Sequence, residues 1–343
     1  MVGKIEEQLP RAAETKSEKN IPGTLEITDF NEPYLRHIEQ VVNFRLIASR
    51  NFRFVADPLH GAARQVLAKL FERNGVNAME IHGNADPLFG GLHPEPIPPH
   101  IKEAQRTVVE KKADAGFATD GDADRVGAID RTGRFVDSHQ IFSILLQYLV
   151  EARGLRGRVT KTFSTTKLVD KLAAKYSLPL YETPIGFKYI VDRMLSTDIL
   201  IGGEESGGIG IPSLGGPERD GILNSVLLSE AMAHYGKSLG ELIEGLHQEF
   251  GPHYYDRVDL VLRPGQKERA IAEAARPELK QFAGFPVVRR EDLDGIKMYL
   301  ENGTWLLVRP SGTEPLLRVY VEGPTTDLVQ EVLTNAEKFI RKL

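Results

Sequence analysis

The sequence has no cysteine among its 343 residues, which excludes disulfide bonds and thiolate metal sites and fits a reducing compartment. It also has no long hydrophobic run. The longest, at 141–150, is followed by Glu151 and is too short to cross a membrane, so it indicates a buried helix. The first residues contain no apolar segment of the kind found in a secretory signal. We therefore expect a cytoplasmic protein.

Clusters of basic residues are missing as well. The formal net charge is −5, and no group of Lys and Arg marks a surface for nucleic acid or for a membrane, so neither is expected as a partner. A hydrophobic content of 41% with 27% charged residues is typical of a globular protein. The length predicts roughly two to four domains rather than one core.

An alternation of strands and helices begins at residue 52. Buried strands are predicted at 52–57, 77–83 and 115–119, with helices between them and a hairpin at 126–136. After a helix at 138–153, the alternation starts again and runs to about residue 250. Strands that alternate with helices of about 10–15 residues indicate α/β sheets. The expected fold class is therefore two consecutive α/β domains with mixed sheets.

The order of elements changes from residue 253 onward. We predict a strand at 253–262, a helix at 267–283, a hairpin that turns at Asn302-Gly303, a further strand and a final helix. This order predicts a smaller α+β domain at the C-terminal end of the chain.

Three predicted strands end in loops that are rich in ligand-type residues. These loops are "DGDADR" at 120–125, "EESGG" at 204–208 and "RPSGTEPLLR" at 309–318. Ligands of open α/β sheets bind beyond the carboxyl ends of the strands. We therefore expect the three loops to build one cleft.

The first loop places Asp120, Asp122 and Asp124 at alternate positions. Two carboxylates about 4 Å apart repel by roughly 4 kcal/mol at an effective dielectric near 20, so a cation is needed to hold them together. An EF-hand is excluded because Arg125 stands where its turning glycine is required. Carboxylates with open positions suit Mg²⁺, and Arg125 suits a phosphate that shares the ion. The alternative is a solvated acidic turn.

The second and third loops suggest a sugar and a phosphate. Glu204 and Ser206 stand between paired glycines, and a carboxylate beside a hydroxyl suits the vicinal hydroxyls of a sugar; the alternative is a flexible exposed turn. The third loop combines backbone N–H groups, hydroxyls and guanidinium groups, which form an anion site, although an ordinary β-turn is also possible. Its residues are Arg309, Ser311, Gly312, Thr313 and Arg318.

Two further residues have weaker patterns. Lys188 in "TPIGFKYI" opens a predicted helix, where the helix dipole does not favour a lysine, so a phosphate-binding role and a solvated lysine both remain open. His60 in "DPLHGAA" is predicted to be a structural histidine.

The three loops, in this order, resemble those of the α-D-phosphohexomutase family, which interconverts hexose 1-phosphates and hexose 6-phosphates. "TPIGFKYI" and "FGGLHPEPIPPHI" are similar to the phosphoglucomutase/phosphomannomutase branch, and the resemblance covers residues from about 40 to 343. It implies Mg²⁺ as the cofactor, and hexose phosphate and hexose 1,6-bisphosphate as partners.

The resemblance also implies roles for individual residues. It implies Asp120, Asp122 and Asp124 as metal ligands. It implies three catalytic residues. Arg125 would lie near the phosphoserine, Lys161 matches approximately the position of a lysine proposed as a general base in the family, and Lys188 would help to bind phosphate. It implies substrate contacts to the sugar O3 and O4 from Glu204 and Ser206, and to the distal phosphate from Arg309, Ser311, Gly312, Thr313 and Arg318.

One departure from the family pattern is clear. The family reaction runs through a phosphorylated serine in a T-A-S-H-N-P loop on a first domain, and these 343 residues contain no such loop. The only Ser-His pair, Ser138-His139, precedes a predicted helix, where the serine is interpreted as an N-cap. The predicted organisation is a tail of a missing first domain plus linker at 1–39, an α/β domain with the metal loop at 40–140, an α/β domain with the sugar loop at 141–253, and an α+β domain with the phosphate loop at 254–343.

Two functional hypotheses follow from this departure. The first is a hexose phosphate mutase that is truncated here and inactive alone, with a separate phosphoserine domain as a further expected partner. The second is a non-catalytic protein, derived from the same family, that binds or senses sugar phosphates. An upstream in-frame "SHNP" segment would favour the first hypothesis.

Overall fold

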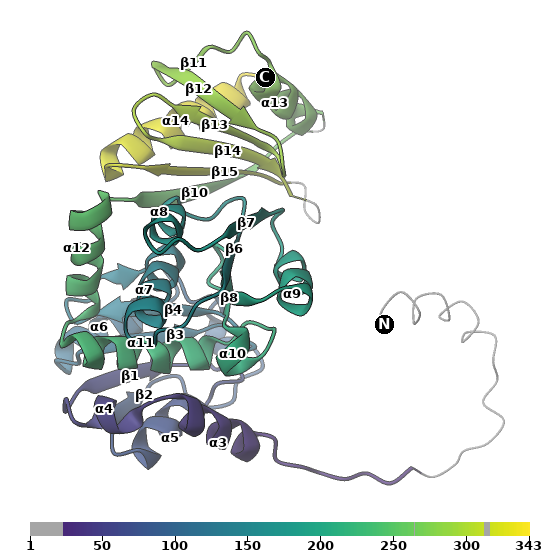
Figure 1. The fold of residues 1–343 in the computed structure, drawn as a ribbon. Helices are drawn as coiled ribbons and strands as arrows, with labels where there is room; N and C mark the ends of the chain where they lie inside the picture. The colour runs from purple at the N-terminus through teal and green to yellow at the C-terminus, as the bar shows by residue number, and fades with distance from the viewer. Residues whose placement is uncertain (1–22, 264, 312–315) are drawn as a thin grey trace. The chain divides into compact units, whose positions relative to one another are not determined.

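The computed structural model describes residues 23–263, 265–311 and 316–343 (Figure 1). Residues 1–22 of the predicted tail and linker, and the tip of the third loop with Gly312 and Thr313, lie outside these residues. Of the described residues, 23–34 belong to a unit distinct from Leu35–Leu343. Across the described ranges, every helix is too short or too polar to traverse a lipid bilayer.

The first sheet carries the aspartate loop between two of its strands. Its strand order is β2-β1-β3-β4-β5. Strand β1 is parallel to β2 and β3, whereas β4 is antiparallel to both of its neighbours, β3 and β5. Buried Val55 and Ala118 on the strands pack against Val108 of a covering helix. The elements are α3 (Asn31–Val41), α4 (Phe44–Ala48), β1 (Arg53–Asp57), α5 (Val66–Arg73), β2 (Asn77–Glu80), η1 (Phe89–Gly91), α6 (Lys102–Glu110), β3 (Ala115–Thr119), β4 (Val126–Asp130) and β5 (Phe135–Val136).

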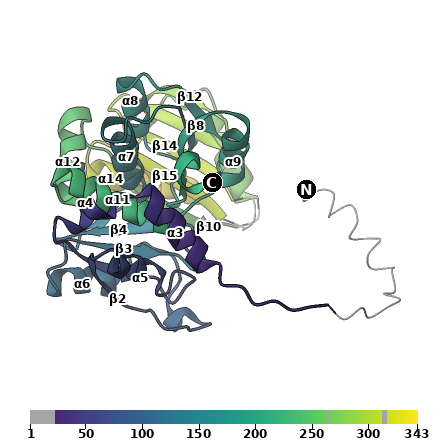
Figure 2. The ribbon, with the colours of Figure 1, turned by 60° about the horizontal axis from the view of Figure 1, so that its bottom comes forward.

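The second sheet has the order β7-β6-β8-β9, in which only β9 is antiparallel. The buried helix α11 contacts both α7 of this domain and β4 of the first sheet, as the turned view shows (Figure 2). The elements are α7 (Ser138–Glu151), β6 (Arg158–Thr162), α8 (Leu168–Lys175), β7 (Leu180–Thr183), α9 (Phe187–Ser196), β8 (Ile199–Gly203), β9 (Ile209–Gly210), α10 (Pro212–Gly215), α11 (Gly221–Tyr235) and α12 (Leu239–Phe250).

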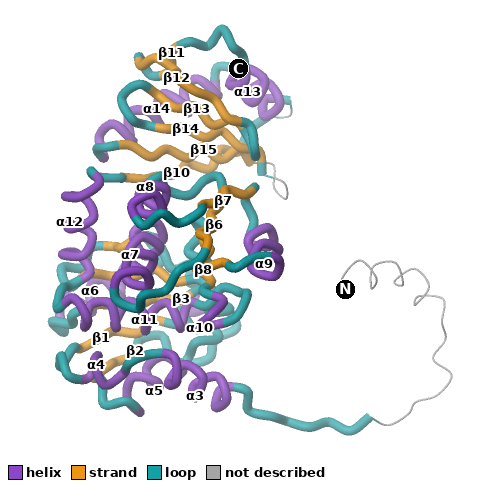
Figure 3. The backbone as a smooth tube through the Cα atoms, viewed as in Figure 1, coloured by secondary structure: helices purple, strands orange, loops and turns teal. Residues whose placement is uncertain are grey.

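The third sheet is antiparallel, in the order β10-β15-β14-β13-β12-β11, and α13 and α14 cover one face (Figure 3). On the other face, Trp305 and Tyr320 pack with Phe163 of the preceding domain. The elements are β10 (Tyr254–Val261), α13 (Gln266–Ala275), β11 (Gln281–Phe282), β12 (Phe285–Glu291), β13 (Ile296–Leu300), β14 (Trp305–Pro310), β15 (Leu316–Gly323) and α14 (Thr326–Arg341). The predicted fold class is confirmed.

Two local predictions are wrong. The helix predicted at 267–283 ends at Ala275, because Pro277 disfavours helical dihedrals at Arg276 before it. Ser138 is not the N-cap of α7. Asp137 is, since its carboxylate accepts the backbone N–H of Gln140 at 2.9 Å in a capping box.

Candidate functional site

The aspartate loop joins β3 to β4 and gathers its three carboxylates. Oxygens of Asp120, Asp122 and Asp124 lie within 4.8 Å of one another. Asp120 is buried and Asp122 is exposed. The turn requires a left-handed backbone at Ala123, with φ 66°, which is uncommon for a residue with a side chain. The three aspartates that alternate in the sequence therefore also lie close together in the fold.

The carboxylates of this loop repel one another. Burial, opposed by the Arg219 guanidinium and reinforced by the charges of Asp120 and Asp122, raises the pKa of Asp124 to about 6. A divalent cation relieves such repulsion, and clustered carboxylate oxygens are the ligands that hard cations prefer. The donor set therefore fits a hard divalent cation.

Arg125 is held by the same loop. Its Nε donates to Asp120 Oδ2 at 2.6 Å and its backbone N–H donates to Asp120 Oδ1 at 3.0 Å. Its Nη1 lies 3.6 Å from Glu95 Oε1. These contacts fix the guanidinium beside the three aspartates, where its remaining N–H groups can meet an anion.

The second loop lies against the first. The backbone of Gly208 forms an isolated antiparallel bridge with Arg125, and Val126 N–H donates to Gly207 O at 3.4 Å. Glu204 is buried, and Ser206 Oγ donates to its Oε1 at 2.6 Å. Burial raises the pKa of Glu204. The predicted metal and sugar loops are thus adjacent.

Arg219, which the sequence analysis did not single out, connects these two loops. Its Nη2 lies 2.5 Å from Asp124 Oδ2, and its Nη1 donates to Glu204 Oε1 at 3.2 Å. A Cβ at position 208 would lie 2.3 Å from the Arg219 Cδ atom, so Gly208 leaves room for this side chain. The only sequence signal was an arginine next to Asp220, the N-cap of α11.

A second residue missed from the sequence is Glu205. Its carboxylate accepts hydroxyl hydrogen bonds from Ser164 and from Thr162, the latter at 3.2 Å. Its backbone carbonyl accepts one from Ser138 Oγ. Glu205 therefore ties the second loop to the end of β6 and to the start of α7.

A cavity of 410 Å³ lies beside these loops. Its lining comes from all three domains, including Glu95, Ser206 and Arg257. Among the described residues, the third loop contributes nothing to this cavity, and the C-terminal domain faces it through β10 instead. One cleft built from all three loops therefore remains a prediction.

The third loop presents two arginines. Arg309 on β14 and Arg318 on β15 are directly paired across the strands, so their side chains share one face of the sheet. Each has an acidic neighbour, with Arg309 Nε 3.1 Å from Asp294 Oδ2 and Arg318 Nε 3.5 Å from Asp259 Oδ2. Like charges at opposed positions disfavour each other, which suits an anion between them.

The contacts of Ser311 and Lys188 do not by themselves indicate a binding role. Ser311 is buried, and its backbone N–H donates to Leu316 O at 2.9 Å, which closes the base of the third loop. Lys188 is exposed in the first turn of α9, with its Nζ 4.9 Å from the centroid of the Tyr189 ring.

Lys161 lies in a buried ion-pair network. Its Nζ is paired with Asp170 and with Glu182, the latter at 3.5 Å, and donates to Thr166 O at 3.0 Å. The side chain has no exposed surface and does not line the cavity. These contacts support a structural cation rather than a base that meets substrate. His60, which was predicted to be structural, is buried, with Nδ1 3.1 Å from Asn84 O.

Three family models match consecutive parts of the chain. They are phosphoglucomutase/phosphomannomutase alpha/beta/alpha domain II at 32–133, alpha/beta/alpha domain III at 137–250 and the C-terminal domain at 269–338. The chain therefore belongs to the phosphoglucomutase/phosphomannomutase family, within the α-D-phosphohexomutase superfamily.

Individual relatives agree with this assignment. A phosphoglucomutase/phosphomannomutase of Thermococcus kodakarensis is 30% identical over 93% of this chain and 67% of its own length. A phosphoglucosamine mutase of Carboxydothermus hydrogenoformans is 34% identical over 85% of this chain and 61% of its own. A crystal structure assigned as a phosphomannomutase, from Thermus thermophilus, has a TM-score of 0.81 at 32% identity and covers 93% of this chain and 68% of that one. The chain thus spans about two thirds of the length of such relatives.

Proposed function

We propose that the chain forms the substrate-binding and metal-binding part of a phosphohexomutase that interconverts hexose 1-phosphate and hexose 6-phosphate, with glucose or mannose as the sugar. The main observation in support is that Arg219 bridges Asp124 of the aspartate loop and Glu204 of the second, glycine-rich loop. This contact joins a cation site to a sugar-type site. The membership of a family whose compared members are named mutases supports the same activity.

In this proposal, Asp120, Asp122 and Asp124 hold Mg²⁺. When bound, the ion neutralises and polarises the phosphoryl group that is transferred. Arg125 donates to that group, as its fixed position beside Asp120 supports. We also propose a cytoplasmic location, as expected from the sequence.

The sugar and the idle phosphate are bound by the other two loops. Glu204 and Ser206 form hydrogen bonds to vicinal sugar hydroxyls, because a buried carboxylate gains most from a hydroxyl donor. Arg309 and Arg318 hold the phosphate that is not reacting, with Ser311, Gly312 and Thr313 completing the loop. Lys188 adds a further charge toward phosphate. We propose no proton transfer by Lys161, since its ammonium group is already paired with carboxylates.

Substitution of the phosphate-binding arginines tests this proposal. Arg309→Ala and Arg318→Ala are each expected to weaken the binding of glucose 1,6-bisphosphate by about 10- to 100-fold, because a charge-assisted hydrogen bond contributes about 1.5–3 kcal/mol. Calorimetric titration in the presence of Mg²⁺ measures this loss.

Arg276→Ala is the matched control, because Arg276 is an exposed arginine of the same domain whose ion-pair partners, Glu273 and Glu278, are both close to it in the chain. Thermal unfolding checks that each variant remains folded. Unchanged affinity in both loop variants would refute the phosphate assignment.

A further inference from the structure

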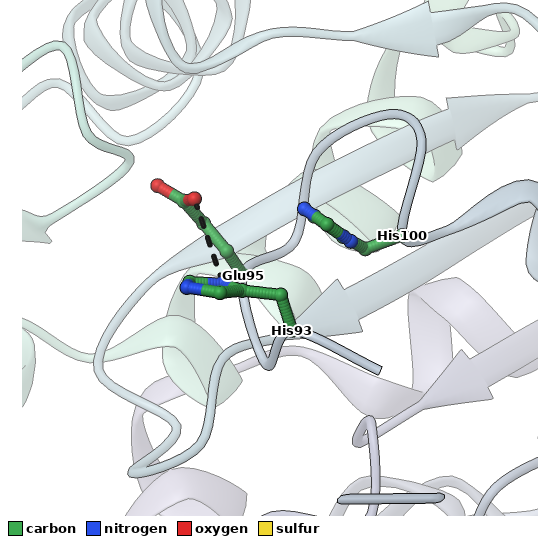
Figure 4. A group of neighbouring side chains, drawn as sticks. All are labelled: His93, Glu95 and His100. Carbon is green, nitrogen blue, oxygen red and sulfur yellow. Dashed lines mark ion pairs between the residues drawn. The ribbon is translucent and has the colours of Figure 1, made fainter. Parts of the chain in front are cut away.

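A second cluster of side chains with metal-ligating donor atoms lies outside the aspartate loop. The segment between η1 and α6 reads "HPEPIPPH" at 93–100 and contains His93, Glu95 and His100. Figure 4 shows that both imidazoles and the carboxylate come from this one loop and lie side by side. Donor atoms of the three side chains all lie within 4.8 Å of one another.

The local backbone brings these residues together. Glu95 N–H donates to His93 O at 2.8 Å, and His100 N–H donates to Ile97 O at 2.9 Å, so the segment folds back twice over a few residues. The rings of His93 and His100 have centroids 5.2 Å apart. The loop is rich in proline, and proline restricts φ and lowers the entropy lost when a loop becomes fixed.

The two oxygens of Glu95 face different partners. Oε1 is 3.6 Å from Nη1 of Arg125, whereas Oε2 is 3.8 Å from Nδ1 of His93. Oε2 is thus directed toward the histidines while the other oxygen is anchored by a guanidinium. Hydrogen-bonded or charged partners behind a carboxylate ligand commonly orient it in metal sites.

We infer that His93, Glu95 and His100 form a second cation site that takes a borderline divalent metal ion of the Zn²⁺ class. Two imidazole nitrogens and one carboxylate suit Zn²⁺ and its neighbours, whereas Mg²⁺ prefers oxygen and water. Ligands of a tetrahedral ion at about 2.1 Å are about 3.4 Å apart, so the present separations need only small side-chain rotations. The His93 side chain is 67% exposed and has space for such a rotation.

The site also adjoins the proposed reaction centre. Glu95 contacts Arg125 and lines the 410 Å³ cavity, so an ion bound to Oε2 lies one side chain away from the aspartate loop. The site is nevertheless distinct from that loop, because its ligands differ in residue type and belong to another segment. The inference does not depend on mutase activity.

Calorimetric titration of the 343-residue chain with Zn²⁺, in excess Mg²⁺ to occupy the aspartate loop, tests the inference. Removal of even an outer partner of a metal ligand typically costs 10–100-fold in metal affinity. His93→Ala and His100→Ala are therefore each expected to weaken Zn²⁺ binding by at least about tenfold. Co²⁺ gives a second readout, since its visible absorption band should require both histidines.

Two variants serve as controls. His234→Ala removes another exposed histidine, and Asp122→Asn removes an exposed carboxylate of the aspartate loop. Both are expected to keep the wild-type affinity for Zn²⁺. Circular dichroism establishes that the histidine variants are folded. Wild-type Zn²⁺ affinity in folded His93→Ala and His100→Ala, or an equal loss in Asp122→Asn, would overturn the inference.

Discussion

The 343 residues alone, supplied with Mg²⁺ and glucose 1,6-bisphosphate, are expected to give no measurable conversion of glucose 1-phosphate to glucose 6-phosphate. The proposed reaction passes a phosphoryl group between the sugar and a phosphoserine, and this sequence has no T-A-S-H-N-P loop. Binding of sugar phosphate should persist, because the aspartate, glycine-rich and phosphate loops are all in the chain. A coupled dehydrogenase assay of glucose 6-phosphate measures the conversion.

Addition of a phosphoserine-bearing first domain, fused or separate, is expected to give turnover. Asp122→Asn in the same preparation is the matched control, and its rate is expected to fall about 10³-fold, because metal stabilisation of a transferring phosphoryl group is worth several kcal/mol. Turnover by the 343 residues alone would require another phosphoryl carrier. Sugar-phosphate binding without turnover in the fused chain would favour the non-catalytic binding protein.

Glu322→Ala is expected to lower the free energy of unfolding by about 3–5 kcal/mol, which is the cost of breaking a buried charged network. Glu322 on β15 is buried, and its Oε1 accepts hydrogen bonds from His253 Nδ1 at 3.0 Å, Trp305 Nε1 at 3.0 Å and Lys167 N–H at 3.1 Å. Its loss leaves these donors without their acceptor. Urea unfolding followed by circular dichroism measures the change, and Glu301→Ala, at an exposed hairpin turn, is the control.

The same carboxylate makes stability depend on pH. Burial raises the pKa of Glu322, but the hydrogen bond and charge of His253, a hydrogen bond from Thr166 and the charge of His139 together outweigh burial, and the folded-state pKa is about 2 against the ordinary value of 4.5. A depressed folded-state pKa stabilises the fold above pH 4.5, and this contribution is lost as the pH falls toward 2. Glu322→Gln should therefore show a flatter stability profile than the wild type over this interval. Parallel profiles would contradict the assignment.

The sequence was sufficient for the features that depend on local patterns. Alternating apolar strands and amphipathic helices identified most strands of the three sheets, and "AGFAT" matches β3 from Ala115 to Thr119, but the short strands β9 and β11 were not predicted. The aspartate loop was recognisable because its carboxylates are neighbours in the chain, and the structure keeps them together. Errors arose where a local rule was misapplied, as when the helix was extended through Pro277.

Contacts between distant segments could not be predicted in the same way. Arg219 meets Asp124 only because α11 packs on β4, and Glu95 meets Arg125 only through the fold of its proline-rich loop. The burial of Lys161 is another example, because "RVTKTFS" predicts a strand whether Lys161 is a catalytic base or a buried structural cation. Nothing in that string shows that Asp170 and Glu182 converge on its ammonium group.

Asp294 links Arg309 of the third loop to the segment that precedes α9. One oxygen of this carboxylate, Oδ2, both pairs with Arg309 and accepts the backbone N–H of Ile185 at 2.9 Å, in the segment that leads into Lys188. Under the proposed function, a phosphate that binds Arg309 must displace or share that carboxylate. Because the coupling between two binding events is reciprocal, a ligand that rearranges the Ile185 segment is then expected to change the affinity of Arg309 for phosphate. Asp294 Oδ2 is thus a contact through which binding in one domain is expected to influence binding in the other.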